Sequence, residues 1–202
     1  FPQILQAFAA FRERHPDAVL YLHTELTGRN GGVNLPVLVE SLELPQGSVL
    51  FADQYRYQFD PYSPELMGKV YSTFDVLLNP AKGEGFGLTP LEAQACGTPV
   101  IVTDFSAMKE VCGAGWKCEY DLEWTPQLSW QANPRVVDIV DALGRCYSLP
   151  EPTRSDLSAQ AVEHAAQYDA DRVMQKHFLP AMEEVAERFA DREPQTLKAV
   201  AA

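Results

Sequence analysis

Two glutamates, Glu84 and Glu92, lie eight residues apart on either side of a glycine-rich turn. Gly83, Gly85 and Gly87 occupy alternate positions in this turn. Glycine permits positive φ angles and lets a ligand approach the main chain closely. The backbone amides that open the following helix have no intrahelical partners, so they could bind a phosphate group. The spacing matches neither the dinucleotide fingerprint nor a P-loop, and a purely structural turn remains an open alternative.

The two glutamates differ in what the sequence allows them to do. Thr89-Pro90-Leu91-Glu92 matches a capping box, in which Glu92 would only satisfy a backbone donor, at about 1 kcal/mol. If the helix instead begins near Gly87, Glu92 lies one turn inside it and could accept hydrogen bonds from a diol. Glu84 precedes the glycines and cannot belong to that capping box. We therefore interpret Glu84 as a functional carboxylate.

The elements around the turn form a recognisable unit. An apolar run at 76–78 leads into the turn, and a helix is expected over 88–96. Gly97 and Pro99 end that helix, and a β-branched run at 100–103 follows. The order of strand, loop, helix and strand is typical of a parallel crossover unit.

The same alternation extends over most of the chain and predicts an α/β fold with a Rossmann-like parallel sheet. The expected strands are apolar runs at 18–23, 48–52, 76–78, 100–103 and 116–119. The expected helices cover 2–14, 35–42, 63–74, 88–96, 106–113, 136–143, 155–168 and 170–191. Because the strands are apolar runs, we expect helices on both faces of the sheet. Ligands bind beyond the carboxyl ends of such strands, where the glycine turn lies.

Several segments have more specific predictions. Residues 53–62 are expected to form a long, aromatic-rich loop, and 121–133 an insertion of unassigned role that holds Trp124 and Trp130. Ser106 is expected to cap its short helix. We predict one domain over 1–191 and a frayed tail over 192–202.

Composition limits the classes of function. The chain has 202 residues, 46% of them hydrophobic, and a net charge of −12, which disfavours a broad nucleic-acid surface. The four cysteines lack Cys-x-x-Cys spacing and the four histidines lack ligand spacing, so free thiols in a reducing compartment are expected. No apolar run is long enough for a membrane span, and no signal peptide is visible. These features predict a cytoplasmic protein, and the start at Phe1 suggests a fragment of a longer one.

A resemblance to a known family rests on the central stretch. Residues 84–93, Glu-Gly-Phe-Gly-Leu-Thr-Pro-Leu-Glu-Ala, and 95–101, Ala-Cys-Gly-Thr-Pro-Val-Ile, resemble the Glu-x7-Glu region of the family-4 retaining glycosyltransferases. Those enzymes have the GT-B fold, in which two Rossmann-like domains face each other across a cleft. The order of elements over 1–190 resembles their C-terminal, nucleotide-sugar-binding domain.

The resemblance implies a hexosyltransferase that uses a nucleoside diphosphate sugar, such as a UDP or GDP sugar, and retains the anomeric configuration. Glu84 would take the catalytic position, hydrogen-bonding the donor sugar near the reacting carbon without acting as a covalent nucleophile. Glu92 would bind the ribose hydroxyls. The amides of Phe86 to Leu88 would hold the diphosphate or the sugar. The implied donor-binding residues are Gln54, Tyr55, Gly85, Phe86, Gly87, Leu88, Thr89 and Glu92.

The resemblance also implies what is absent. The family uses an arginine and a lysine before its first helix to neutralise the diphosphate, and Phe1-Pro2-Gln3-Ile4-Leu5 resembles the residues after that lysine. The cationic pair and the N-terminal acceptor domain, the expected partner, would thus lie outside this fragment and leave it inactive alone. No metal cofactor is expected, because the helix start and those cations would hold the diphosphate. Lys82 is interpreted as a solvated loop lysine.

Three alternatives remain open from the sequence. The chain could belong to another GT-B enzyme, such as a synthase or an epimerase. It could be a nucleotide-binding module without catalysis, or an α/β domain without a ligand. The nucleotide base, the donor sugar, the acceptor and the oligomeric state are not specified by the sequence.

Overall fold

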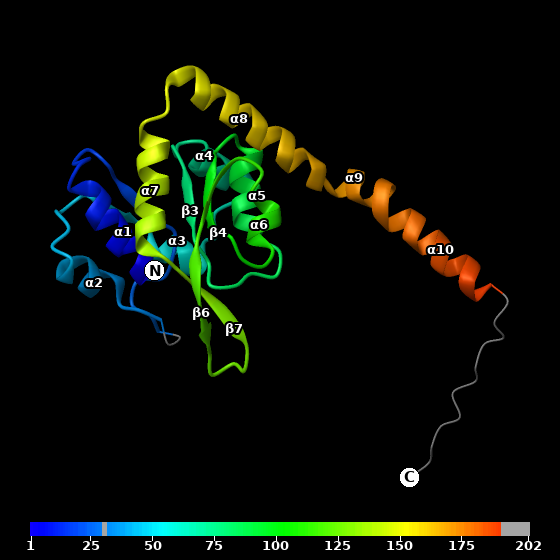
Figure 1. Cartoon of the computed structure of the whole chain (residues 1–202), viewed down its shortest axis with the longest axis horizontal. Coiled ribbons are helices and arrows are strands. Elements are labelled where there is room, and N and C mark those ends of the chain that lie inside the picture. Colours follow the sequence, from blue (N-terminus) through cyan, green and yellow to red (C-terminus); the bar gives the residue numbers. More distant parts are fainter. Residues whose placement is uncertain (30–31, 191–202) are drawn as a thin grey trace, which may run out of the picture. The chain divides into compact units, whose positions relative to one another are not determined.

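The computed structural model describes residues 1–29 and 32–190. The chain divides into two compact units, Phe1–Ala165 and Ala166–Ala202. The first unit contains every strand and forms an α/β fold (Figure 1). The tail predicted over 192–202 lies outside the described residues, and the predicted domain boundary at residue 191 stays a prediction.

All five predicted strands form, and all of them pair in parallel. They make two hydrogen-bonded ladders, one of β1 with β2 and one in the order β3-β4-β5. The strands are β1 (Leu20–Leu22), β2 (Val49–Phe51), β3 (Leu77–Asn79), β4 (Val100–Thr103) and β5 (Gly115–Cys118). The parallel strands that the sequence predicts are therefore present, but divided between two ladders.

Helices connect these strands, as the alternating pattern predicts. In the first unit they are α1 (Pro2–Arg12), α2 (Leu35–Ser41), α3 (Gln54–Phe59), α4 (Pro64–Tyr71), α5 (Leu88–Ala95), α6 (Met108–Val111), α7 (Val136–Tyr147) and α8 (Glu151–Ala165). Two of these helices are capped by a side chain at their start: Asn34 Oδ1 accepts from Val37 N at 3.2 Å, and Ser63 Oγ accepts from Leu66 N at 3.3 Å.

The second unit is helical throughout its described part. It contains η1 (Ala166–Tyr168), α9 (Ala170–Val173), the π-helical η2 (Met174–Phe178) and α10 (Leu179–Phe189). The helix predicted over 170–191 thus contains a π-helical turn. Among residues 1–29 and 32–190, no helix combines the length and apolar character that a membrane crossing requires.

Strand β4 is the centre of the fold and is buried on both faces. Ile101 packs into an apolar cluster with Phe11 of α1 and Ile139 of α7. Val100 and Val102 point the other way, into a cluster built from α4, α5 and α6. Because side chains alternate along a strand, this apolar run supplies both clusters, and the sheet is covered on both faces as predicted.

Helix α1 joins the two ladders. Its Phe11 contributes to the cluster under β4, whereas its Leu5 packs with Leu22 of β1 and Leu35 of α2. Leu5 is fully buried. One amphipathic helix thus contributes to two apolar clusters. Both ladders, and with them the carboxyl ends of β1 and β3, therefore belong to one compact unit.

The prediction of a long loop over 53–62 is wrong in part, because helix α3 occupies most of this segment. Asp53 Oδ1 accepts a hydrogen bond from Arg56 N at 2.9 Å and caps this helix. Asp53 is a typical N-cap residue, but the aromatic residues that follow it favoured the prediction of a loop.

The insertion predicted over 121–133 is an antiparallel hairpin of β6 (Tyr120–Trp124) and β7 (Trp130–Pro134). Trp124 and Trp130 are direct cross-strand partners with ring centroids 5.4 Å apart. Arg135 Nη2 pairs with Asp121 Oδ1 at 2.6 Å across the base of the hairpin. Cross-strand aromatic and charged pairs of this kind stabilise a two-stranded ribbon.

Candidate functional site

The glycine-rich turn follows the carboxyl end of β3 and opens α5, as the sequence predicts. Gly87 is the N-cap residue, with φ 94° and ψ 57°. A Cβ atom at Gly87 would lie 3.1 Å from Met108 Cε. Only glycine combines that left-handed backbone with so close a neighbour at low cost.

The start of α5 decides between the two interpretations of Glu92. The helix begins at Leu88, so Thr89 lies inside it, and no side chain caps it. The capping-box interpretation is therefore wrong. Glu92 lies one turn into the helix. The amides of Leu88 and Thr89 precede the first bond of the helix, from Leu91 N to Gly87 O at 3.4 Å, and so have no partner within it.

Helix α5 is held in place by one buried polar side chain, Gln94, which is 0% exposed. Its Nε2 atom donates to Pro90 O at 3.0 Å and to Val111 O at 2.9 Å. Its Oε1 atom accepts from the amides of Gly113 and Ala114, each at 3.0 Å. This amide therefore links α5 to α6 and to the turn before β5, and thereby fixes the helix that carries Glu92.

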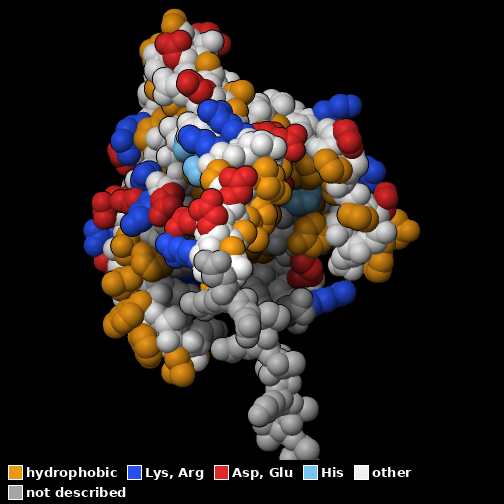
Figure 2. All heavy atoms as spheres, turned by 90° about the vertical axis from the view of Figure 1, so that its right-hand side faces the viewer, with side chains coloured by type: hydrophobic (Ala, Val, Ile, Leu, Met, Phe, Trp, Pro, Cys, Tyr) orange, Lys and Arg blue, Asp and Glu red, His pale blue; other side chains and the backbone are white. Residues whose placement is uncertain are grey.

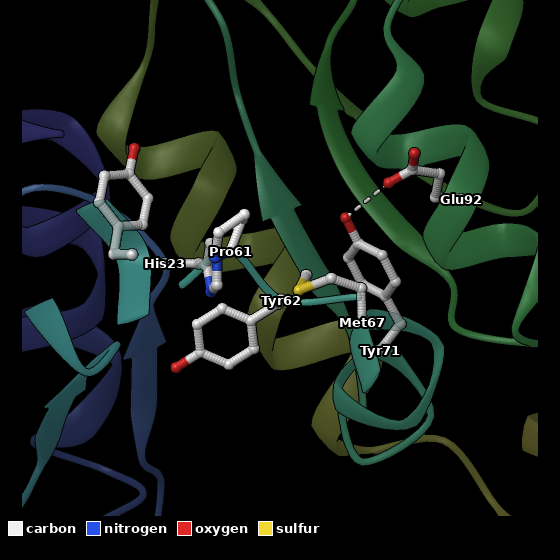
Figure 3. Close-up of a pocket in the computed structure, with 7 residues that line it drawn as sticks. His23, Pro61, Tyr62, Met67, Tyr71 and Glu92 are labelled. Atoms are coloured by element: carbon white, nitrogen blue, oxygen red, sulfur yellow. Dashed lines mark hydrogen bonds between the residues drawn. The ribbon is translucent and has the colours of Figure 1, made fainter. Parts of the chain in front are cut away.

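The side chain of Glu92 contacts a buried tyrosine. Tyr71 Oη donates a hydrogen bond to Glu92 Oε2 at 2.9 Å. Burial and the neighbouring Glu92 carboxylate raise the pKa of Tyr71, so its hydroxyl stays protonated. Figure 3 shows the phenol of Tyr71 pointing directly at the carboxylate.

A pocket of about 380 Å³ lies beside this pair. Its lining comes from the end of β1, from α3, from the segment between α3 and α4, and from α4 and α5: His23, Tyr57, Pro61, Tyr62, Met67, Tyr71 and Glu92. We call Met67, Tyr71 and Glu92 the α5 wall, and the remaining four residues the aromatic wall. In Figure 3, Glu92 lies on one side of the pocket, and His23, Pro61 and Tyr62 on the other.

The aromatic wall is built from ring contacts. The His23 ring lies 4.8 Å from the Tyr62 ring and 5.5 Å from the Tyr57 ring, both edge-on. Tyr21 Oη lies 3.0 Å from His23 Nδ1. Burial lowers the pKa of His23, which favours its neutral form, and burial together with Tyr62 raises the pKa of Tyr21 to about 12. This wall thus offers aromatic surface around an imidazole whose neutral form is favoured.

The two residues predicted near a nucleotide base, Gln54 and Tyr55, lie outside this lining. Gln54 Oε1 accepts from Leu26 N at 3.2 Å, and its Nε2 donates to Thr24 O at 3.1 Å and Ala52 O at 2.8 Å. Gln54 therefore links the loop after β1 to the end of β2. Tyr55 is 69% exposed. Their roles toward a ligand stay predictions.

Glu84 is exposed in the glycine turn, and its backbone is fixed by Ser106. Glu84 N donates to Ser106 Oγ at 3.1 Å, and Gly85 N donates to Glu84 Oε1 at 3.2 Å. The prediction that Ser106 caps α6 is wrong, since Ala107 is the N-cap residue and no side chain bonds there. Ser106 positions the catalytic candidate instead.

The β6–β7 hairpin supports the turn from one side. Lys82 Nζ pairs with Glu123 Oε2 at 2.9 Å, and Ala132 N donates to Lys82 O at 2.8 Å. Lys82 is exposed in the loop, as predicted, and its ammonium group forms a surface ion pair with Glu123. Figure 2 shows acidic and basic side chains mixed over the face that it presents, in keeping with the net charge of −12.

The described residues contain no group of three or more His, Cys, Asp or Glu that could hold a metal ion. The sequence has one Asp-x-Asp, Asp169-Ala170-Asp171. Asp169 caps α9 with its side chain, accepting from the amides of Asp171 and Arg172. All four cysteines are free thiols.

The sequence predicted that Glu84 and Glu92 lie at one glycine turn, but it did not predict the residues on the opposite side of the pocket. His23, Tyr57, Tyr62 and Tyr71 were not singled out, although they supply most of the lining. They share only an aromatic or histidine side chain, located after β1, in α3, between α3 and α4, and at the end of α4, and that signal is weak without the fold.

The sequence profile of the family described as glycosyl transferases group 1 matches residues 3–125 of this chain. The chain belongs to this family of glycosyltransferases. The match covers the glycine turn, both of its glutamates, and every residue that lines the pocket. The family resemblance predicted from residues 84–101 is therefore confirmed.

Similar proteins agree with this family. A D-inositol 3-phosphate glycosyltransferase from Corynebacterium urealyticum is 29% identical over 95% of this chain and 42% of its own length. One from Actinosynnema mirum is 31% identical over 84% of this chain and 37% of its own length. This chain thus spans less than half of the length of those two relatives.

A solved structure has the same fold. It is the C-terminal domain of a glycosyl transferase group 1 family protein from Francisella tularensis, with a TM-score of 0.61 and 18% identity. The match covers 82% of this chain and 77% of that one. The predicted fold class, the Rossmann-like α/β domain of a GT-B glycosyltransferase, is therefore confirmed.

Proposed function

We propose that this chain is the donor-binding part of a retaining glycosyltransferase that transfers a hexose from a nucleoside diphosphate sugar. The observation that carries this proposal is the position of Glu92. It lines a pocket whose opposite side is aromatic, and it lies one turn behind the glycine-rich start of α5. A carboxylate, a helix start with backbone amides that can bind phosphate, and an aromatic surface could hold the ribose, the phosphates and the base of a nucleotide.

The pocket suggests an arrangement for the donor. The base would contact the aromatic wall, where Tyr57 and Tyr62 offer ring surface. The ribose hydroxyls would donate to Glu92. The diphosphate would bind the amides of Phe86, Gly87 and Leu88 at the start of α5, where the helix dipole favours negative charge.

The reaction would proceed beside Glu84. The bond between the anomeric carbon and the diphosphate oxygen breaks, and its electron pair leaves with the diphosphate. The acceptor hydroxyl bonds to the same face of that carbon and loses its proton to the leaving group. The α5 amides would stabilise the charge that develops on the diphosphate, and Glu84 would hydrogen-bond the sugar.

We propose that two further components come from a longer protein, because the chain spans less than half of the two relatives described above. The pocket side chains bring no Lys or Arg, so we propose that cations from elsewhere in the full-length protein complete the diphosphate site. The acceptor would bind to another domain. Because the two curated relatives described above are named D-inositol 3-phosphate glycosyltransferases, a phosphorylated cyclitol is the first acceptor to test.

The proposal predicts that Glu92→Ala weakens nucleotide binding far more than it lowers stability. Hydrogen bonds to a charged group contribute about 1.5–3 kcal/mol, so the Kd should rise roughly tenfold to a hundredfold. Calorimetry with UDP, GDP and ADP measures this on the protein with any sequence that its gene encodes around these residues. Melting temperatures measured in parallel report stability.

Glu163→Ala is the matched control, because Glu163 is an exposed glutamate on α8, away from the pocket lining. It should leave the Kd unchanged. Equal losses in both variants, or no nucleotide binding by the wild type, would contradict the donor-site proposal. A nucleotide-binding module without catalysis would bind the nucleotide yet give no transfer or hydrolysis of a nucleotide sugar in a donor screen.

A further inference from the structure

Tyr71 is a buried tyrosine whose hydroxyl group faces the candidate site. It is the last residue of α4, and only 6% of its surface is exposed. Its hydroxyl donates to Glu92 Oε2 at 2.9 Å. A phenol is a rigid donor with few rotatable bonds, so the direction of this hydrogen bond is set by where the ring is packed.

The ring of Tyr71 is fixed from several sides. It packs in the apolar cluster with Ala93 and Val100, and it meets the Phe74 ring edge-on at 6.4 Å. Its carbonyl oxygen accepts from Thr98 Oγ1 at 2.7 Å. The buried Thr98 follows α5 and precedes β4, so Tyr71 is tied to the same helix–strand connection as Glu92.

This fixation matters because Glu92 itself is exposed on α5. A glutamate at such a position has three rotatable bonds and would otherwise sample several orientations. The Tyr71 bond engages one carboxylate oxygen. In the described part of the chain, the other oxygen, Oε1, accepts no hydrogen bond.

We propose that Tyr71 is a positioning residue that orients the Glu92 carboxylate toward the ribose diol, and that it thereby sets the preference for ribonucleotides over 2′-deoxyribonucleotides. This inference rests on the proposed function of the pocket and deepens it. Tyr71 acts through Glu92 and does not itself need to touch the nucleotide. A ligand without the 2′-hydroxyl cannot make one of the bonds that the oriented carboxylate offers, and therefore gains little from Tyr71.

Tyr71→Phe tests the inference, because it keeps the buried ring and removes only the hydroxyl group. Calorimetry on the full-length protein compares UDP, GDP and ADP with their 2′-deoxy counterparts. We expect the variant to bind the ribonucleotide roughly five- to tenfold more weakly, the effect of one lost hydrogen bond. Its affinity for the 2′-deoxynucleotide should change less than twofold, so the ribose preference should largely disappear.

Tyr120→Phe is the matched control, since Tyr120 packs against the Phe105 ring at 5.1 Å and does not line the pocket. It should leave both affinities unchanged. A second variant keeps the test informative: in a Glu92→Ala background, Tyr71→Phe should have no further effect on the ribose preference, because the two residues act as one unit.

Each outcome is decisive. Equal weakening of both nucleotide types by Tyr71→Phe, or no change in either, would overturn the positioning role while wild-type binding still supports the proposed function. An additive effect of the two substitutions would overturn it as well. Absence of nucleotide binding by the wild type would instead refute the proposed function, and the inference would fall with it.

Discussion

The two walls of the pocket are held by different kinds of interaction. In the α5 wall, buried polar groups fix each element: Gln94 makes four hydrogen bonds, and Thr98 and Tyr71 each add one. In the aromatic wall, edge-on ring contacts around His23 hold Tyr57 and Tyr62. The first wall is specified mainly by buried directional bonds. The second is specified mainly by the packing of exposed or half-buried rings, with one exposed hydrogen bond between Tyr21 and His23.

This difference suggests that the two walls have different roles in the proposed donor site. Directional, desolvated bonds penalise any displacement of α5, because each broken bond leaves a buried group without a partner. Ring contacts at a half-exposed surface tolerate small shifts at low cost. We expect the α5 wall to fix the ribose and the diphosphate, and the aromatic wall to adapt to the base.

The largest expected effect comes from Gln94→Leu. The leucine keeps the approximate size but leaves the amides of Gly113 and Ala114 and the carbonyl oxygen of Val111 without their partner. Ala114 and Val111 are buried, whereas Gly113 is exposed. Each orphaned buried group costs about 1–3 kcal/mol, so two of them predict a loss of about 2–6 kcal/mol in the free energy of unfolding. Chemical denaturation monitored by circular dichroism measures it.

The control for this loss is Gln160→Leu, an exposed glutamine on α8, which should cost less than about 0.5 kcal/mol. If the two substitutions cost the same, buried hydrogen bonds do not hold the α5 wall, and the comparison between the walls fails.

A smaller effect, confined to binding, is expected from Tyr57→Ala. Removing one ring from the aromatic wall should weaken nucleotide binding roughly fivefold to a hundredfold, the effect of one lost base–aromatic contact. Stability should change little, because Tyr57 is 38% exposed. Calorimetry and melting temperature, measured side by side, separate the two effects.

Tyr55→Ala is the matched variant on the same helix, since Tyr55 lies outside the pocket lining. Its affinity should equal that of the wild type. Stronger weakening by Tyr55→Ala than by Tyr57→Ala would mean that the base lies where the sequence alone predicts, and that the aromatic wall is misassigned.

The smallest effect is expected at acid pH, in the loop that follows β1 and supports the aromatic wall. The exposed Glu25 carboxylate accepts from Thr27 Oγ1 and from the amides of Thr27, Gly28 and Arg29, which lowers its pKa to about 2. Because this pKa lies below the ordinary value of 4.5, the stabilisation is complete above pH 4.5 and is lost as the pH falls toward 2.

We therefore expect the melting temperature of Glu25→Gln to approach that of the wild type between pH 4.5 and 2. The difference should be constant at higher pH. Glu163→Gln, at an exposed position of α8, should show no such convergence. A constant difference between Glu25→Gln and the wild type down to pH 2 would show that the loop does not depend on this carboxylate.

The sequence predicted most of the fold because its signals are local. The apolar run of β4, the caps at Asn34 and Ser63, and the glycines before α5 all act within a few residues. Where two local signals competed, the prediction failed. A capping box at Thr89 was possible from the sequence, but the helix begins at Leu88, because the left-handed Gly87 is its N-cap residue. The hairpin at Tyr120–Pro134 was missed because β6 is mostly exposed and lacks the apolar run that marks the other strands.

The amino-acid sequence alone determined the family, the parallel strands, and the pairing of Glu84 with Glu92 around one glycine turn. Only the tertiary structure decided what faces Glu92. Tyr71 lies 21 residues before it, His23 directly follows a strand of the other ladder, and no periodicity links these positions. Tyr71, His23 and Glu92 lie close together because α4 and α5 pack against β4 and because α1 joins the two ladders. A pocket built from such long-range contacts has no local signature, because its residues are neighbours only after the core has formed.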